Sequence, residues 1–172
     1  MHSSTISQHV VERVGMDEVI KTLFAGSNRV QQSMLTMIIT VLSNATHFKR
    51  ISQDANVIYG VVRILESPSL VLRGKVYLFV AEITSKSLGA LLECCHAKIV
   101  TYIERDSRKT ASNSNTKADA QAVWYLKQCL ELVVTTMLKQ VPTIISGEIF
   151  IFFHSLYVTW SQRVIRNPNC LK

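Results

Sequence analysis

The residues best suited to chemistry in this chain are the adjacent thiols of Cys94 and Cys95 and the imidazole of His96. A thiol beside an imidazole could form a nucleophilic pair, and the three side chains could also bind zinc. Neighbouring residues on a helix point about 100° apart, so these side chains would not converge on one ion. No second cluster supplies the further ligands that zinc requires. We therefore expect buried, reduced cysteines here.

Other enzyme signatures are missing from the sequence. It contains no GxxxxGK[ST] phosphate loop, no GxGxxG motif and no HExxH metal pair. The HRD and DFG motifs of protein kinases are absent as well. His47 and His154 are isolated, and the carboxylates are spread over several helices without a paired arrangement. We expect a chain that is not an enzyme and that needs no cofactor or metal.

The charge balance is basic, with 19 Lys and Arg against 12 Asp and Glu among 172 residues. Such an excess can attract nucleic acid, anionic lipid or acidic protein. The positive residues are scattered, and the one cluster consists of Arg105, Arg108, Lys109 and Lys117. Nucleic acid is therefore not the expected partner, although a basic adaptor for nucleic acid or anionic membrane surfaces remains the alternative hypothesis.

Residues 143–160 (TIISGEIFIFFHSLYVTW) have the apolar density and nearly the length of a short membrane span. The segment nevertheless contains Glu148, and an ionisable side chain in lipid costs about 2–3 kcal/mol. We expect a buried helix here and no membrane partner. The N-terminus lacks the apolar core of a secretory signal, so we expect a cytoplasmic protein.

The apolar residues recur with helical spacing along most of the chain. Met16, Val19, Ile20 and Leu23 form an i, i+3, i+4, i+7 stripe before the turn at Gly26. Asp54 and Ser87 are expected to cap later helices, and residues 45–53 to form a link or a brief helix. The predicted helices cover about 16–25, 29–42, 54–65, 70–85, 87–103 and 117–140.

The chain also resembles itself at an offset of 42 residues. Residues 19–44 overlay residues 61–86 without a gap, so that Gly26-Ser27 meets Pro68-Ser69 and the apolar stripes coincide. This period falls within the range of about 40–47 residues found in HEAT and armadillo solenoids. The sequence thus predicts an all-α fold, a right-handed superhelix of armadillo/HEAT-like repeats.

This pattern predicts the organisation of the chain. We expect a flexible N-terminal segment over 1–14 and about three repeats over 15–140. The polar stretch 106–117 (DSRKTASNSNTK) predicts a mobile loop inserted in the repeats. Residues 141–172 are expected to form one or more divergent hydrophobic helices and a tail. Their departure from the repeat pattern suggests the end of a fragment or of an isoform, or a segment that lacks a stacked neighbour.

Two segments, AGSNRVQQSMLTMIITVLSN and ANVIYGVVRILESPSLVLRGKVYLFVAEI, resemble armadillo-type repeats. They are also similar to the C-terminal helical region of a Fused-related pseudokinase of the Unc-like kinase group. Such proteins carry an N-terminal kinase-like domain that this sequence lacks, so no nucleotide-binding residue is carried over. The resemblance implies a cytoplasmic scaffold in cilium formation and neuronal cytoskeletal regulation, located at the ciliary base or on the cytoskeleton.

In armadillo units the third helix lines a groove that receives extended peptides. The resemblance therefore implies a protein-binding groove formed by the corresponding helices here, with unknown protein partners. The expected groove residues are Gln32, Thr36, Thr40, Leu78, Glu82, Gln121, Tyr125 and Gln128.

The expected loop also carries hydroxyl groups among its basic residues, at Ser107, Thr110 and Ser112. Phosphorylation there would replace a positive patch with negative charge and change the attraction to a partner. A passive insertion is the alternative interpretation of this loop.

Overall fold

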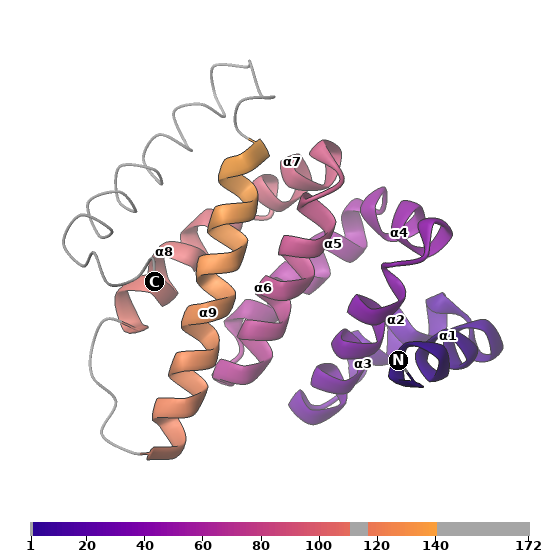
Figure 1. Cartoon of the computed structure of the whole chain (residues 1–172), viewed down its shortest axis with the longest axis horizontal. Helices are drawn as coiled ribbons and strands as arrows, with labels where there is room; N and C mark the ends of the chain where they lie inside the picture. Colours follow the sequence, from indigo (N-terminus) through magenta and orange to yellow (C-terminus); the bar gives the residue numbers. More distant parts are fainter. Residues whose placement is uncertain (1, 111–116, 141–172) are drawn as a thin grey trace.

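The computed structural model describes residues 2–110 and 117–140, and these form α-helices with no strand among them (Figure 1). The predicted all-α class is therefore confirmed. The elements are α1 (His2–Val14), α2 (Met16–Ala25), α3 (Asn28–Val41), α4 (Ala45–Ser52), α5 (Ala55–Arg63), the 3-10 helix η1 (Ile64–Glu66), α6 (Leu70–Thr84), α7 (Leu88–His96), α8 (Ile99–Thr110) and α9 (Lys117–Gln140).

The N-terminal segment differs from the expectation that residues 1–14 are flexible. Residues 2–14 form α1, which contacts α2 and α3. Val11 is only 2% exposed and belongs to the core. The prediction was wrong because tertiary packing of this one apolar position stabilises a helix whose own sequence is largely polar.

Side-chain caps begin several helices at the positions that the sequence indicates. Asp54 accepts hydrogen bonds from the backbone N–H groups of Asn56 (3.0 Å) and Val57 (3.1 Å) at the start of α5. Ser87 accepts one from Ala90 (3.1 Å) at the start of α7. Such caps satisfy donors that the first turn of a helix leaves without partners. Both predicted caps are confirmed, and residues 45–52 form the helix α4.

The predicted helix over 87–103 is two helices in the structure. α7 ends at His96, and α8 begins at Ile99. Between them Lys98 adopts a left-handed backbone conformation (φ 63°), which ends an α-helix and redirects the chain. The sequence pattern misses this break because both helices bury an apolar face and the residue in the left-handed conformation is not glycine.

The core is centred on α6, which α3, α5, α7 and α9 surround. α3 lies along one side of α6 and α9 along the other (Figure 1). This helix is buried on several faces rather than along one stripe, as the positions of Leu72, Val76 and Phe79 show. Its orientation therefore determines how α3 and α9 are placed relative to each other.

A buried carboxylate joins α8 to α6. Asp106 is 0% exposed and accepts hydrogen bonds from Arg73 Nε (3.0 Å), the Tyr77 hydroxyl (2.9 Å) and Arg105 Nε (2.8 Å). The two guanidinium groups also donate to backbone carbonyls, Arg73 to Ser67 (3.1 Å) and Arg105 to Leu65 (2.7 Å). The network thus holds α8, α6 and the turn before α6 together.

This network corrects the expected loop insertion at 106–117. Residues 106–110 belong to α8, and residues 111–116 lie outside the described part of the chain. The loop prediction was wrong for 106–110 because a polar composition indicates a solvent-exposed loop only where the polar side chains have no partners inside the protein. Here the partners of Asp106 come largely from α6, 29 and 33 residues away in sequence.

Removing the carboxylate is expected to destabilise the protein strongly. Asp106→Ala leaves Arg73 buried without its counter-ion, which typically costs about 3–5 kcal/mol. The control Arg108→Ala removes an exposed pair with Glu104 (3.5 Å) and should cost no more than about 0.5 kcal/mol. Urea unfolding followed by circular dichroism measures both. Equal losses in the two variants would contradict a structural role for the network.

The hydroxyl of Tyr77 should give stability a defined alkaline dependence. Burial, and then the charge of Asp106, raise the pKa of Tyr77 above its ordinary value, so the folded state holds this proton more tightly than the unfolded chain. The contribution of this hydroxyl to the free energy of unfolding is complete below about pH 10 and is lost as the pH rises further. Tyr77→Phe should therefore cost about 1 kcal/mol near neutral pH, and this cost should shrink above about pH 10. A cost that stays constant up to about pH 11, measured by urea unfolding in reductant, would contradict this assignment.

Candidate protein-binding face

The residues expected to bind a partner lie on three helices that are neighbours in space. Gln32, Thr36 and Thr40 lie on α3, Leu78 and Glu82 on α6, and Gln121, Tyr125 and Gln128 on α9. Because α6 lies between the other two, we refer to this surface as the α3–α6–α9 face (Figure 1). The structure thus brings together the three helices that the offset and the resemblance single out.

Polar side chains connect α3 to α6 on this face. Lys75 Nζ donates to Thr36 Oγ1 at 2.6 Å, and Gln32 Nε2 donates to Ser69 Oγ at 3.4 Å. Thr40 bonds within its own helix, donating to the carbonyl of Thr36 (2.8 Å). Two of the three residues expected on α3 therefore contact the middle helix or its cap. Sequence reasoning did not single out Lys75.

A glycine and an aromatic ring connect α6 to α9. A Cβ atom at Gly74 would lie 2.5 Å from Cε1 of Tyr125, so the ring occupies the space that a side chain at Gly74 would need. Burial raises the pKa of Tyr125 to about 12, and its neighbour Cys129 adds to the shift. Tyr125 is therefore a half-buried packing residue as well as a surface residue.

The remaining expected residues are at the surface without meeting one another. Leu78 is half-buried against the core. Glu82 forms an ion pair with Lys86, and Gln128 Nε2 donates to Glu131 Oε2 at 3.5 Å. Gln121 is exposed on the first half of α9. These residues offer separate contact points rather than a preassembled cluster.

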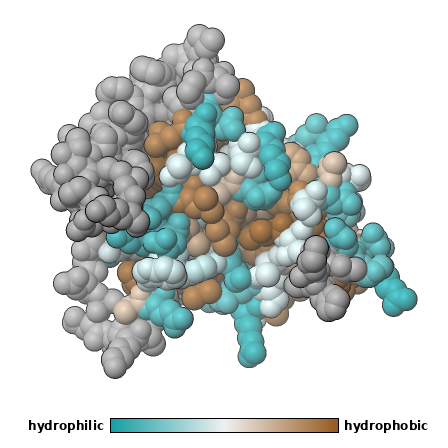
Figure 2. All heavy atoms as spheres, viewed as in Figure 1, coloured by the Kyte–Doolittle hydropathy of each residue, from teal (hydrophilic) through white to brown (hydrophobic). Residues whose placement is uncertain are grey.

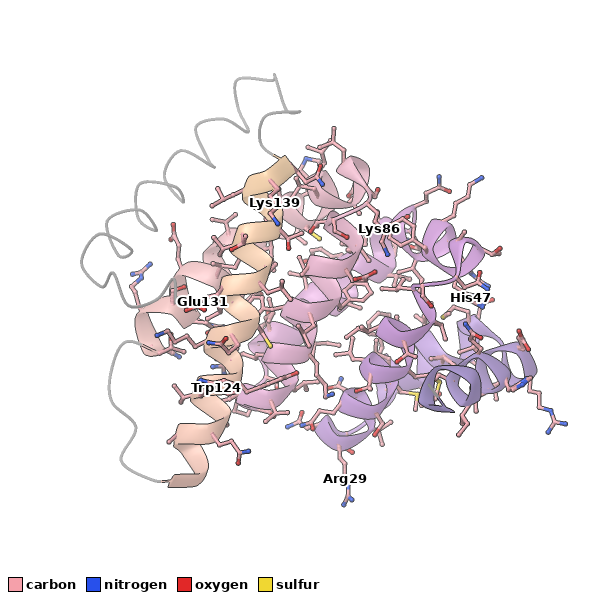
Figure 3. The ribbon with its side chains drawn as sticks, in the orientation of Figure 1. Arg29, His47, Lys86, Trp124, Glu131 and Lys139 are labelled. Carbon is pink, nitrogen blue, oxygen red and sulfur yellow. The ribbon has the colours of Figure 1, made fainter. Side chains whose placement is uncertain are left out.

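The sequence analysis did not single out two exposed apolar side chains on α9. Trp124 is 63% exposed and Leu132 is 48% exposed. Figure 2 shows apolar side chains in the middle of this view, bordered by polar ones, and Figure 3 places Trp124 on α9. The available signal was their position around the helix: they lie about 80° apart, and both point away from the buried residues Leu126 and Val133.

The Cys94–Cys95–His96 sequence does not form a site in the structure. Cys94 is fully buried, whereas the His96 side chain is 75% exposed and faces Glu93. Burial raises the pKa of both thiols, that of Cys95 to about 11, so they are held in the unreactive protonated form. In the residues that the structure describes, no three His, Cys, Asp or Glu side chains are grouped to hold a metal ion.

The expected basic and phosphorylatable loop is partly rearranged. Ser107 and Thr110 belong to the last turn of α8, where Thr110 Oγ1 donates to the carbonyl of Ser107 (3.2 Å), and Ser112 lies outside the described residues. Arg105 is bound to Asp106 and Arg108 to Glu104. These two arginines are therefore already engaged with carboxylates.

The apolar segment 143–160, with Glu148 and His154, also lies outside the described residues. Among the helices that are described, none combines the length and apolar character of a membrane span.

The described residues define an all-α protein with one face built from three adjacent helices. The chain is 37% identical over 143 residues to the mouse serine/threonine-protein kinase ULK4, a match covering 83% of this chain and 11% of that protein. It is 28% identical over 143 residues to the serine/threonine-protein kinase RUNKEL of Arabidopsis thaliana, covering 78% of this chain and 10% of that protein. The chain is thus homologous to a region of ULK4 and spans about a tenth of the length of these curated relatives.

No protein-family model matches the chain, and no solved structure matches it significantly.

The close approach at Gly74 can be tested directly. Gly74→Ala should displace the Tyr125 ring and cost about 1–3 kcal/mol of unfolding free energy, although alanine is the better helix former. Gly89→Ala is the matched control, because the nearest atom to its Cβ would be 3.9 Å away. It should be neutral or slightly stabilising. If Tyr125→Ala does not reduce the cost of Gly74→Ala in a double-mutant cycle, the two residues are not coupled as proposed.

Proposed function

We propose that the chain is a non-catalytic scaffold of armadillo-like helical repeats that binds protein partners along the α3–α6–α9 face. The observation that carries this proposal is the placement of three helices side by side with half-buried and exposed side chains of mixed polarity. Surfaces of this composition are typical of non-obligate protein interfaces, with exposed aromatic and aliphatic groups among polar ones.

The proposed repeats are α1–α3, α4–α6 and α7–α9. In this division α3, α6 and α9 are the third helices of successive units, and they are neighbours in space. The short connections and the contact between α2 and α5 also agree with units that stack in order. A solenoid of this kind uses its repeated helices as an extended binding surface.

The homology supports a place within a longer protein related to kinases. Both relatives are named protein kinases and are about ten times longer than the matched region. We infer that this chain corresponds to a C-terminal, regulatory helical region of a pseudokinase, without catalytic activity of its own. With the resemblance noted in the sequence, this favours a cytoplasmic scaffold acting at the ciliary base or on the neuronal cytoskeleton.

The alternative function as a basic adaptor has less support. It depended on a free cluster of basic residues around 105–117, and Arg105 instead belongs to the buried network of Asp106. That hypothesis predicts binding to nucleic acid or anionic vesicles that weakens steeply with salt.

Capture of partners from a cell extract tests the proposed face. Thr36→Trp on α3 and Gln128→Trp on α9 introduce large uncharged side chains at two exposed positions of the face. We expect each to weaken partner binding at least about tenfold, as substitutions at interface centres commonly do, while circular dichroism shows unchanged helicity. Quantitative mass spectrometry of the captured proteins provides the measurement.

Lys49→Trp is the control, because Lys49 is an exposed polar residue on α4, outside this face. It should leave the captured proteins unchanged. If it reduces capture as much as the two face variants do, or if the face variants have no effect, the binding surface lies elsewhere.

A further inference from the structure

Lys75 lies at the centre of the α3–α6–α9 face. It belongs to the middle helix, and its Nζ reaches Thr36 Oγ1 on α3 (2.6 Å). On the other side it is close enough to Cys129 of α9 to oppose, in part, the rise in the pKa of that thiol that burial causes. This ammonium group therefore joins α6 to α3 by a hydrogen bond and acts electrostatically on α9.

The positive charge of Lys75 is not neutralised by a neighbouring side chain. Among the ion pairs of the described residues, none involves Lys75, and none involves Arg29 on α3. Glu82 of α6 is paired with Lys86, and Glu131 of α9 accepts a hydrogen bond from the amide of Gln128. The ammonium group of Lys75 is thus a positive charge in the middle of the face that forms no ion pair with the described residues.

The surroundings of Lys75 would strengthen an ion pair formed with its ammonium group. Lys75 is half-buried, and Leu78 lies one helical turn further along α6 and is half-buried as well. Tyr125 packs over the adjacent Gly74. An ion pair formed where apolar groups exclude water is stronger than one on a fully solvated surface, since the effective dielectric constant is lower.

We propose that Lys75 is the anchor for an acidic peptide segment of a partner protein, whose carboxylate binds the ammonium group while a neighbouring apolar side chain packs on Leu78. This inference rests on the proposed function and adds the chemistry of the partner. Thr36 holds the lysine side chain in place before the partner binds, which lowers the entropic cost of forming the contact.

Selection from a random-peptide display library tests the proposal without a known partner. The full chain should select peptides that contain Asp or Glu beside an apolar residue. Changing that acidic residue to its amide should weaken binding at least about tenfold, and binding should weaken with salt. Lys75→Met should abolish the acidic preference while keeping the aliphatic stem, and Lys75→Glu should select peptides with Lys or Arg instead.

Lys49→Glu on α4 is the control for the change in charge alone, since Lys49 is exposed and lies outside the face. It should select the same acidic peptides as the unaltered chain. If peptides bind and Thr36→Trp weakens their binding, but they show no acidic preference or keep it in Lys75→Met, this proposal is wrong and the proposed function stands. If no selected peptide depends on the face, both are wrong.

Discussion

The placement of α6 depends on one buried carboxylate. Taking Asp106 out of water would be costly if it were unpaired, and the two guanidinium groups and the Tyr77 hydroxyl offset that cost. The remaining guanidinium donors bond to the carbonyls of Leu65 and Ser67, so the positive charges are also well solvated by the protein. Since α6 is the middle helix of the α3–α6–α9 face, this network, which includes Arg73 and Tyr77 of the same helix, helps to set the geometry of the face.

The parts of the fold that follow from local sequence could be predicted. Helix periodicity and short-range capping gave the ranges of most helices, because a cap such as that of Asp54 involves residues two and three positions away. The burial of Asp106 could not be predicted in this way. Its partners on α6 are 29 and 33 residues away, and the composition of 106–117 taken alone indicates a solvated loop. The helix α1 was missed for a related reason, since packing of Val11 stabilises it.

The candidate face was predicted from the internal offset for α3 and α6, and from the resemblance to armadillo units for α9. The offset of 42 residues relates α3 to α6 and so placed Thr36 and Leu78 on equivalent faces. It pairs Lys75 with Ser33 and therefore gives no sign of a central charge at this position. Trp124 lies on α9, beyond the overlaid segment, where only periodicity within one helix could have indicated an exposed aromatic residue.

Two glycines determine how closely the neighbouring helices approach. At Gly60 on α5, a Cβ atom would lie 2.5 Å from the Phe24 ring of α2, and the same distance separates a Cβ at Gly74 from Tyr125. The two contacts involve different helix pairs, α2 with α5 and α6 with α9. In each pair an aromatic ring packs against a glycine and so fixes the distance between the two helices. The polar network orients α6, and the contact of Gly74 with Tyr125 sets its distance to α9. A partner would therefore meet a face that is already formed, which favours binding because little order has to be created on association.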